Sequence, residues 1–276
     1  MMHSPAVSLP HNAEIFQPML LECGIIAGTG RVSGCRPTKD VSCVDASLTP
    51  TVRRVVGQAI RTGLPETWVH TADAYRFQSE FRQAGVVFIH VPRTAGLSVN
   101  AVLYKQKHRH FTISHLHRVA SRDVLGLPRF TIVRNPWDRA VSAFHFAQQG
   151  GVRDGAQIAR PKQYSGPEFE TFEAFVSLYL YRHDPRELDG VFRPQSDYVC
   201  LRTGQIPFDH VGYFDKIAET EDWLSQILGH PVKLPLSNSC SRIYSDYHEY
   251  FSDKTAEIIA NIYKDDIERF NFSFCR

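Results

Sequence analysis

Net charge, paired cysteines and long apolar runs are all scarce in this 276-residue sequence. Its formal charge is only +2, whereas a general nucleic-acid-binding protein is usually far more basic. We therefore expect no nucleic-acid partner, and any binding of anions should be local. The longest apolar stretch near the start, residues 19–27, contains Glu22 and is too short to span a bilayer. It also lacks the basic flank and the small-residue cleavage site of a secretory signal.

The cysteines are scattered along the chain and form no CxxC pair. This spacing argues against a zinc site and fits free thiols in a reducing compartment, although the count alone leaves disulfides open. We therefore expect a cytoplasmic protein. The six cysteines are Cys23, Cys35, Cys43, Cys200, Cys240 and Cys275.

The character of the chain changes near residue 84. Apolar residues make up 43% of the sequence and charged residues 22%, as in a globular protein that buries a core. Up to about residue 83, however, Gly, Pro, Ser, Thr and Cys are frequent and the periodic runs are short. We predict a turn-rich N-terminal extension of unknown role over residues 1–83 and one domain over residues 84–276.

From residue 85 onward, strand-like and helical segments alternate. This order predicts an α/β fold with a parallel sheet that binds ligands at the carboxyl ends of its strands. Asn135 with Pro136 begins one helix, Ser252 caps another, and Gly229 ends a third. The expected strands are 86–90 and 130–133, and the expected helices are 97–105, 136–148, 169–181, 221–228 and 253–270.

The stretch "VPRTAGLS" joins the first expected strand to the helix that follows it. Unpaired N–H groups and the positive end of the helix dipole make such a loop an anion site. Arg93 supplies charge, Thr94 and Ser98 supply hydroxyl donors, and Ala95 and Gly96 leave room for an anion near the backbone. The loop is not a Walker A motif, because GxxxxGK[ST] is absent. The alternative is a tight turn with an exposed arginine.

The stretch "FTIVRNPWDRAVSAFHF" repeats this order of strand, basic residue and helix. Arg134 ends the strand, and Ser142 lies eight residues later, just over two helical turns on. For Arg139 we expect a salt bridge, with Asp138 or a distant carboxylate, rather than contact with a ligand. Two anion loops on one sheet indicate a ligand with two separated anionic groups.

The two loops together resemble motifs of a known family. "VPRTAGLS" is similar to the 5′-phosphosulfate loop of the sulfotransferases that use 3′-phosphoadenosine 5′-phosphosulfate (PAPS), and "VRNPWDRAVSAF" is similar to their 3′-phosphate motif. The likeness is to carbohydrate sulfotransferases, namely the Golgi-type enzymes, the uronosyl 2-O-sulfotransferases and bacterial relatives. It covers the chain from Val86 to the end, through "PQSDYV", "VGYFDKI", "LSNS" and "IYKDDIERFNF".

This resemblance implies a P-loop-like parallel sheet flanked by helices, and transfer of the sulfuryl group from PAPS to a carbohydrate hydroxyl with release of PAP. PAPS would be the co-substrate, no metal would be required, and the protein would be bacterial. The acceptor would be an oligosaccharide, a polysaccharide or a glycolipid; the oligomeric state stays open. Two alternatives remain: a PAP- or PAPS-binding protein with weak or lost catalysis, and sulfation of a non-carbohydrate hydroxyl.

The resemblance also implies roles for individual residues. Arg134 and Ser142 would hold the 3′-phosphate, and Gln195 and Ser196 would touch the acceptor. The family's loop lysine is replaced by arginine and its second threonine by leucine in this chain, which puts catalytic efficiency in doubt. The residues that would hold the 5′-phosphosulfate are Arg93, Thr94, Ala95, Gly96, Leu97 and Ser98.

The general base is sought in "HRHFTISHLHR", between the two motifs. The uronosyl 2-O-sulfotransferases carry an HxH there whose second histidine is the base, and His117 corresponds to it, with His115 as the second candidate. His108 and His110 best fit an exposed polar segment without a role. A metal site is disfavoured, because no carboxylate or cysteine stands at ligand spacing. With Arg93 near the leaving phosphate, the predicted catalytic residues are Arg93, His115 and His117.

Overall fold

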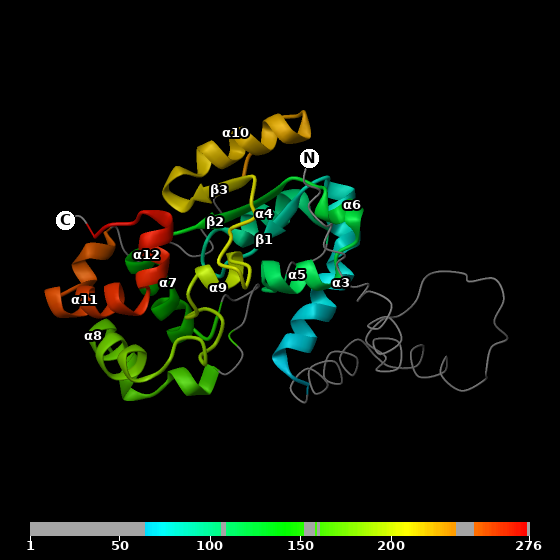
Figure 1. Ribbon diagram of the computed structural model, residues 1–276. Helices are drawn as coiled ribbons and strands as arrows, with labels where there is room; N and C mark the ends of the chain where they lie inside the picture. Colours follow the sequence, from blue (N-terminus) through cyan, green and yellow to red (C-terminus); the bar gives the residue numbers. More distant parts are fainter. Residues whose placement is uncertain (1–63, 106–108, 152–157, 159–160, 236–245, 275–276) are drawn as a thin grey trace, which may run out of the picture.

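The computed structural model describes residues 64–105, 109–151, 158, 161–235 and 246–274 (Figure 1). The greater part of the expected N-terminal extension, residues 1–63, lies outside this range, as do His108 and the "LSNS" stretch. None of the helices in the described ranges combines the length and the apolar character needed to cross a membrane.

Three parallel strands form the centre of the fold. They are β1 (Val87–Ile89), β2 (Arg129–Val133) and β3 (His210–Tyr213), in the spatial order β1-β2-β3. In this register Phe88 pairs with Phe130, and Phe130 pairs in turn with His210. The expected α/β class with a parallel sheet is confirmed. The first two strands agree with the prediction to within one residue at each end.

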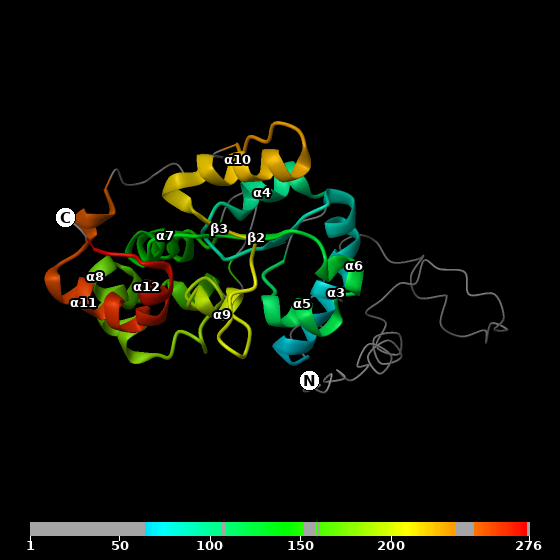
Figure 2. The same cartoon turned by 45° about the horizontal axis from the view of Figure 1, so that its top comes forward.

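A helix follows each strand. They are α4 (Gly96–Leu103), α7 (Pro136–Gln148) and α10 (Ile217–Leu228). The bounds of α7 are those predicted, since the Asn135 side chain accepts a hydrogen bond from the Trp137 N–H and Pro136 occupies the first turn. Figure 2 shows α4 and α10 on one side of the sheet, with α3 (Glu66–Ala84), α5 (Ile113–Val119) and α9 (Ser196–Val199) on the other.

Helix α3 corrects the predicted domain boundary. The sequence predicts an extension up to residue 83, yet α3 spans Glu66–Ala84 and buries Phe77 and Phe81 in the core beneath the sheet. The ring of Phe77 packs edge-on against Phe81 and lies 6.3 Å from the ring of Phe111. The packed part of the chain therefore begins well before residue 84.

A second apolar core lies around α7, and two of the helices expected to pack there are divided into shorter ones. The expected helix 253–270 divides at Tyr263 into α11 (Asp253–Ile262) and α12 (Lys264–Phe270). The Tyr263 hydroxyl donates to the Phe192 carbonyl at 2.7 Å, which holds this break in place. The expected helix 169–181 is broken into short turns. The remaining elements are α6 (Arg122–Leu125), α8 (Phe172–Ala174), a π-helix (Phe175–Tyr179), and 3₁₀ turns at Pro161–Tyr164, Pro167–Phe169, Leu180–Arg182, Phe214–Lys216 and Tyr247–Tyr250.

Candidate active site

The loop between β1 and α4 has an unusual backbone. Arg93 and Ala95 both adopt left-handed conformations, with φ of 72° and 67°. Such strain in non-glycine residues concentrates at functional sites, because the surrounding structure must hold it in place. Left-handed residues also turn N–H groups toward a common point, which makes a concavity for anions. Directly after this loop comes the N-terminus of α4, at Gly96.

Small residues shape this loop from inside. A Cβ on Gly96 would lie 1.7 Å from Nε2 of His90, so only glycine fits beside that ring. Thr94 is fully buried, and its hydroxyl donates to the Val91 carbonyl at 2.8 Å. In this structure the Thr94 hydroxyl therefore stabilises the loop. Ser98 is also buried, whereas Leu97 is 40% exposed at the start of α4.

The arginine of the second motif joins the two loops. Arg134 is buried at the end of β2, and its guanidinium forks onto the carboxylate of Asp138 at 2.7 and 2.8 Å. Its Nη1 donates to the Arg93 carbonyl at 3.1 Å, and its Cζ lies 4.2 Å from the ring centre of Phe214, just beyond β3. The carboxyl ends of all three strands thus come together at Arg134.

Arg93 makes the reciprocal contact. Its Nε donates to the Ser142 hydroxyl at 3.1 Å, and its Cζ lies 4.7 Å from the ring centre of Phe146. Ser142 is nearly buried on α7. Arg93 of the first motif and Ser142 of the second are therefore in direct contact, although they are 49 residues apart in the sequence. Two loops that bind one ligand must lie this close together.

Arg139 differs from its prediction. It is 2% exposed and donates to the carbonyls of Pro92, Val191 and Arg193 at 2.7–3.2 Å. The carboxylate of Asp138 is instead paired with Arg134. The expected Arg139–Asp138 salt bridge is therefore wrong, and Arg139 fixes the backbone on either side of the site.

Gln195 and Ser196 are buried, at 0% and 5% exposure. The Gln195 amide accepts from the Arg134 N–H at 2.9 Å and donates to the Arg134 carbonyl at 2.8 Å. The backbone N–H groups of Gln195 and Ser196 both donate to the buried carboxylate of Asp266, whose pKa is raised by burial. Both residues support the loop after β2 from behind, and neither lines the pocket that contains His110 and His115.

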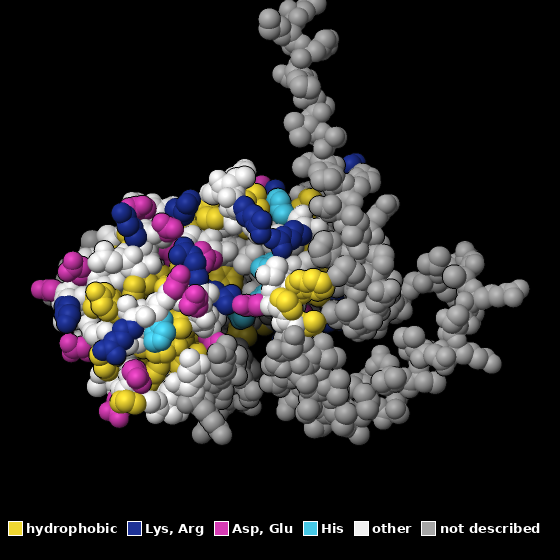
Figure 3. Space-filling view, turned by 60° about the horizontal axis from the view of Figure 1, so that its bottom comes forward, with side chains coloured by type: hydrophobic (Ala, Val, Ile, Leu, Met, Phe, Trp, Pro, Cys, Tyr) yellow, Lys and Arg dark blue, Asp and Glu magenta, His cyan; other side chains and the backbone are white. Residues whose placement is uncertain are grey.

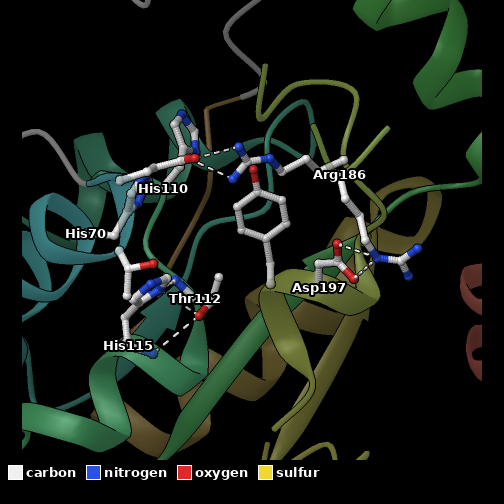
Figure 4. Close-up of a pocket in the computed structure, with 10 residues that line it drawn as sticks. His70, His110, Thr112, His115, Arg186 and Asp197 are labelled. Carbon is white, nitrogen blue, oxygen red and sulfur yellow. Dashed lines mark hydrogen bonds and ion pairs between the residues drawn. The ribbon is translucent and has the colours of Figure 1, made fainter. Parts of the chain in front are cut away.

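That pocket has a volume of about 130 Å³, and one of its lining residues, His110, connects it to the first loop. The His110 ring lies 4.3 Å from the ring of His90, which packs on Gly96. Figure 4 shows His70, His110 and His115 on one side of the pocket and Arg186 and Asp197 on the other. The lining residues are Glu66, Thr67, His70, His110, Thr112, His115, Arg186, Arg193, Asp197 and Tyr198.

Two of these histidines have defined hydrogen-bond partners. Nδ1 of His115 accepts the backbone N–H of Thr112 at 3.2 Å, so the proton of the neutral ring lies on Nε2. Nδ1 of His110 lies 3.4 Å from the His90 carbonyl, which can only accept, so Nδ1 carries the proton and Nε2 keeps its lone pair. Burial lowers the pKa of both rings to about 4.

His110 lines the pocket although the sequence pattern does not single it out, and it is not the exposed residue that the sequence predicts. Its ring is half-buried at the pocket. His117 lies elsewhere, on the exposed side of α5. It does not line the pocket, and burial, followed by the charge of Arg129, lowers its pKa.

Among the described residues, no group of three or more His, Cys, Asp or Glu side chains is arranged to hold a metal ion.

These features define a parallel α/β protein in which two arginine loops meet at the carboxyl ends of the strands, beside a pocket with histidines. Residues 81–273 match the sulfotransferase family, and the chain belongs to that family. The resemblance noted from the two motifs is thereby confirmed at the level of the family. No curated protein and no solved structure matches the chain.

Proposed function

We propose that this protein transfers the sulfuryl group from PAPS to a hydroxyl of a carbohydrate and releases PAP. The observation that carries the proposal is the direct contact between the two loops, Arg93 with Ser142 and Arg134 with the Arg93 carbonyl. A ligand with a 5′-phosphosulfate and a 3′-phosphate needs two such cationic loops at one place. We further propose an oligosaccharide, polysaccharide or glycolipid acceptor and a bacterial cytoplasmic setting.

The donor residues suit this ligand. The 5′-phosphosulfate would take the N–H groups at the start of α4 and the charge of Arg93, and Arg134 with Ser142 would take the 3′-phosphate. In this structure the Arg134 guanidinium donates two parallel hydrogen bonds to the carboxylate of Asp138. A phosphate can accept the same two hydrogen bonds, and charge-assisted bonds of this kind are about twice as strong as neutral ones. Donor binding thus requires Arg134 to share or exchange these contacts.

For the chemical step we propose His110 as the general base, in place of His115 or His117. The acceptor oxygen forms a bond to sulfur while the bond from sulfur to the bridging oxygen of PAPS breaks. The hydroxyl proton passes to Nε2 of His110, and the electron pair leaves with PAP. Nε2 of His115 already bears a proton when the ring is neutral, and His117 is outside the pocket. Arg93 would stabilise the charge that develops on the leaving phosphate.

Ligand-induced stabilisation tests the donor assignment. PAP should raise the melting temperature by several degrees, whereas 5′-AMP, which differs only by lacking the 3′-phosphate, should raise it much less. In calorimetry, Arg134→Ala should weaken PAP binding by about 1.5–3 kcal/mol, the usual contribution of a hydrogen bond to a charged group. Equal stabilisation by PAP and 5′-AMP would remove the PAPS assignment.

Replacing His110 tests the base. With labelled PAPS and a confirmed acceptor, His110→Ala should lower kcat by about 10²–10⁴, the usual contribution of a general base, and leave the Kd for PAP within twofold. His117→Ala, seven residues further along the chain and outside the pocket, is the control and should keep kcat within twofold. If His117→Ala shows the large loss and His110→Ala does not, His117 is the base. PAP binding without turnover on any hydroxyl would favour a binding protein.

A further inference from the structure

The charges that line the pocket neutralise one another. Glu66 receives two hydrogen bonds of 2.7 Å from the guanidinium of Arg193. Asp197 lies 3.2 Å from Nε of Arg186. Each carboxylate that lines the pocket in the described part of the chain is thus matched by a guanidinium. The hydrogen bond from His70, together with Arg193, lowers the pKa of Glu66. The Glu66 carboxylate therefore stays ionised opposite the Arg193 guanidinium.

An acidic ligand group would have to enter beside these existing pairs. A further carboxylate next to Glu66 and Asp197 would be repelled by both or would have to take a guanidinium from one of them. Like charges placed side by side in this way act against the binding of an acidic group. Figure 3 shows basic and acidic side chains intermingled on the face it presents, rather than a field of one sign that would attract a polyanion.

The two histidines present one hydrogen-bond acceptor and one donor to the pocket, and a hydroxyl can pair with either. Nε2 of His110 accepts a hydrogen bond, whereas Nε2–H of His115 donates one, as their Nδ1 contacts determine. A hydroxyl both donates and accepts, so it can form a hydrogen bond with either ring. A carboxylate only accepts and would leave the lone pair of His110 without a donor.

We infer that this pocket selects an uncharged hydroxyl-bearing sugar residue as the acceptor, and disfavours a uronate or a sulfated residue. The inference rests on the proposed function for the transfer step, and it narrows the acceptor to one chemical class. A volume of about 130 Å³ is below the 300–1,000 Å³ of drug-sized ligand pockets, so the pocket accommodates one residue rather than a long segment of polymer.

Matched glycosides test this selection by binding and by turnover. Methyl glucoside and methyl galactoside are compared with methyl glucuronide and methyl galacturonide, which differ from them only by a carboxylate at C6. With PAP bound to the full chain, saturation-transfer NMR should show binding of the neutral glycosides at least tenfold tighter than of the uronides. With labelled PAPS, kcat/KM should show the same order.

A variant separates charge selection from a general defect. Glu66→Gln leaves the Arg193 guanidinium without its carboxylate and should shift the ratio of neutral to acidic binding toward the uronide by at least threefold. Asp123→Asn is the control, since Asp123 pairs with Arg82 at an exposed site remote from the pocket, and its ratio should equal that of the parent.

The outcomes are distinguishable. The neutral glycosides could bind, and lose binding in His115→Ala, while no label is transferred to them. That result would support the pocket assignment and contradict the proposed function. Equal or tighter binding of the uronides would overturn the inference even if transfer occurs. Binding of neither set in the presence of PAP would also overturn it.

Discussion

Gln195 holds the backbone of Arg134, the residue that we propose for the 3′-phosphate, and does not itself line the pocket. Its side-chain amide accepts a hydrogen bond from the Arg134 N–H and donates one to the Arg134 carbonyl. A neighbouring strand would make the same two bonds, and Arg134 directly follows β2. Asp266 in turn holds the Gln195 backbone. The direction of the Arg134 guanidinium therefore depends on a buried amide 61 residues further along the chain.

A second buried glutamine provides a matched test of this positioning role. Gln78 donates to the Val119 carbonyl at 3.1 Å and accepts from the Ser121 N–H at 2.9 Å, away from the loops. Gln78→Ala and Gln195→Ala should each lower the free energy of unfolding by about 2–3 kcal/mol, because each leaves two backbone groups unpaired. Only Gln195→Ala should weaken PAP binding, by about fivefold or more, and it should weaken 5′-AMP binding less.

Urea titration and calorimetry on the two variants give these values. An equal loss of PAP affinity in both, or in neither, would mean that Gln195 contributes to folding alone.

At the scale of the elements, two glycines play opposite roles. Gly229 ends α10 in a left-handed conformation, with φ of 72°, and no atom lies within 4 Å of where its Cβ would be. Gly96 has no such backbone demand and stands in the first turn of α4, yet the His90 ring fills the place of its Cβ. Backbone conformation requires the first glycine, and packing requires the second.

Alanine at each position should separate stability from binding. Gly229→Ala should cost about 1–2 kcal/mol of folding free energy, the penalty of the left-handed conformation, with PAP affinity unchanged. Gly96→Ala has a better helix propensity, by about 1 kcal/mol, but it must displace the His90 ring. We expect PAP affinity to fall more than tenfold in Gly96→Ala, measured by calorimetry. Wild-type affinity in that variant would show that the loop tolerates the shift.

For the whole molecule, the site lies where two apolar cores meet. One core lies beneath the sheet, and the other surrounds α7 and α11. Buried histidines at this junction make folding sensitive to pH. The pKa of His110 is lowered to about 4, chiefly by burial and further by the charges of His70, Arg109 and Arg139, against the opposing effect of the His90 carbonyl.

The direction of this dependence follows from the protons bound in each state. An unfolded histidine has a pKa near 6.5, so between about pH 6.5 and pH 4 the unfolded chain binds protons that the folded chain does not. Stability is therefore complete above pH 6.5 and falls as the pH decreases toward 4. Burial raises the pKa of Asp197 and Asp266, which opposes this loss only near the lower end of the range.

Melting temperatures at pH 7, 6 and 5 test this expectation. The parent protein should lose stability between pH 6.5 and pH 5, and His110→Gln, whose new side chain does not titrate, should lose less over the same interval. A melting temperature that is constant or rises as the pH falls from 6.5 to 5 would contradict the assignment of neutral, buried histidines.

The sequence by itself determined those features that depend on neighbours a few residues away. The bounds of α7, the Ser252 cap and the end of α10 at Gly229 follow from local hydrogen bonds and backbone preferences. The order of strand, basic loop and helix likewise identified Arg93 and Arg134 as the basic residues of the two expected anion loops. The same local rules failed for α3, because buried polar residues on its inner face hide the apolar period.

Only the tertiary structure decided which side chains meet. Arg134 contacts the Arg93 carbonyl across 41 residues, and His110 contacts the His90 carbonyl across 20. No local pattern encodes such contacts, because they arise when separate strands end at the same edge of a sheet. His110 and His117 cannot be told apart by residue type or spacing. Packing alone leaves His110 half-buried at the pocket and His117 exposed on α5, and that difference decides which of them we propose as the base.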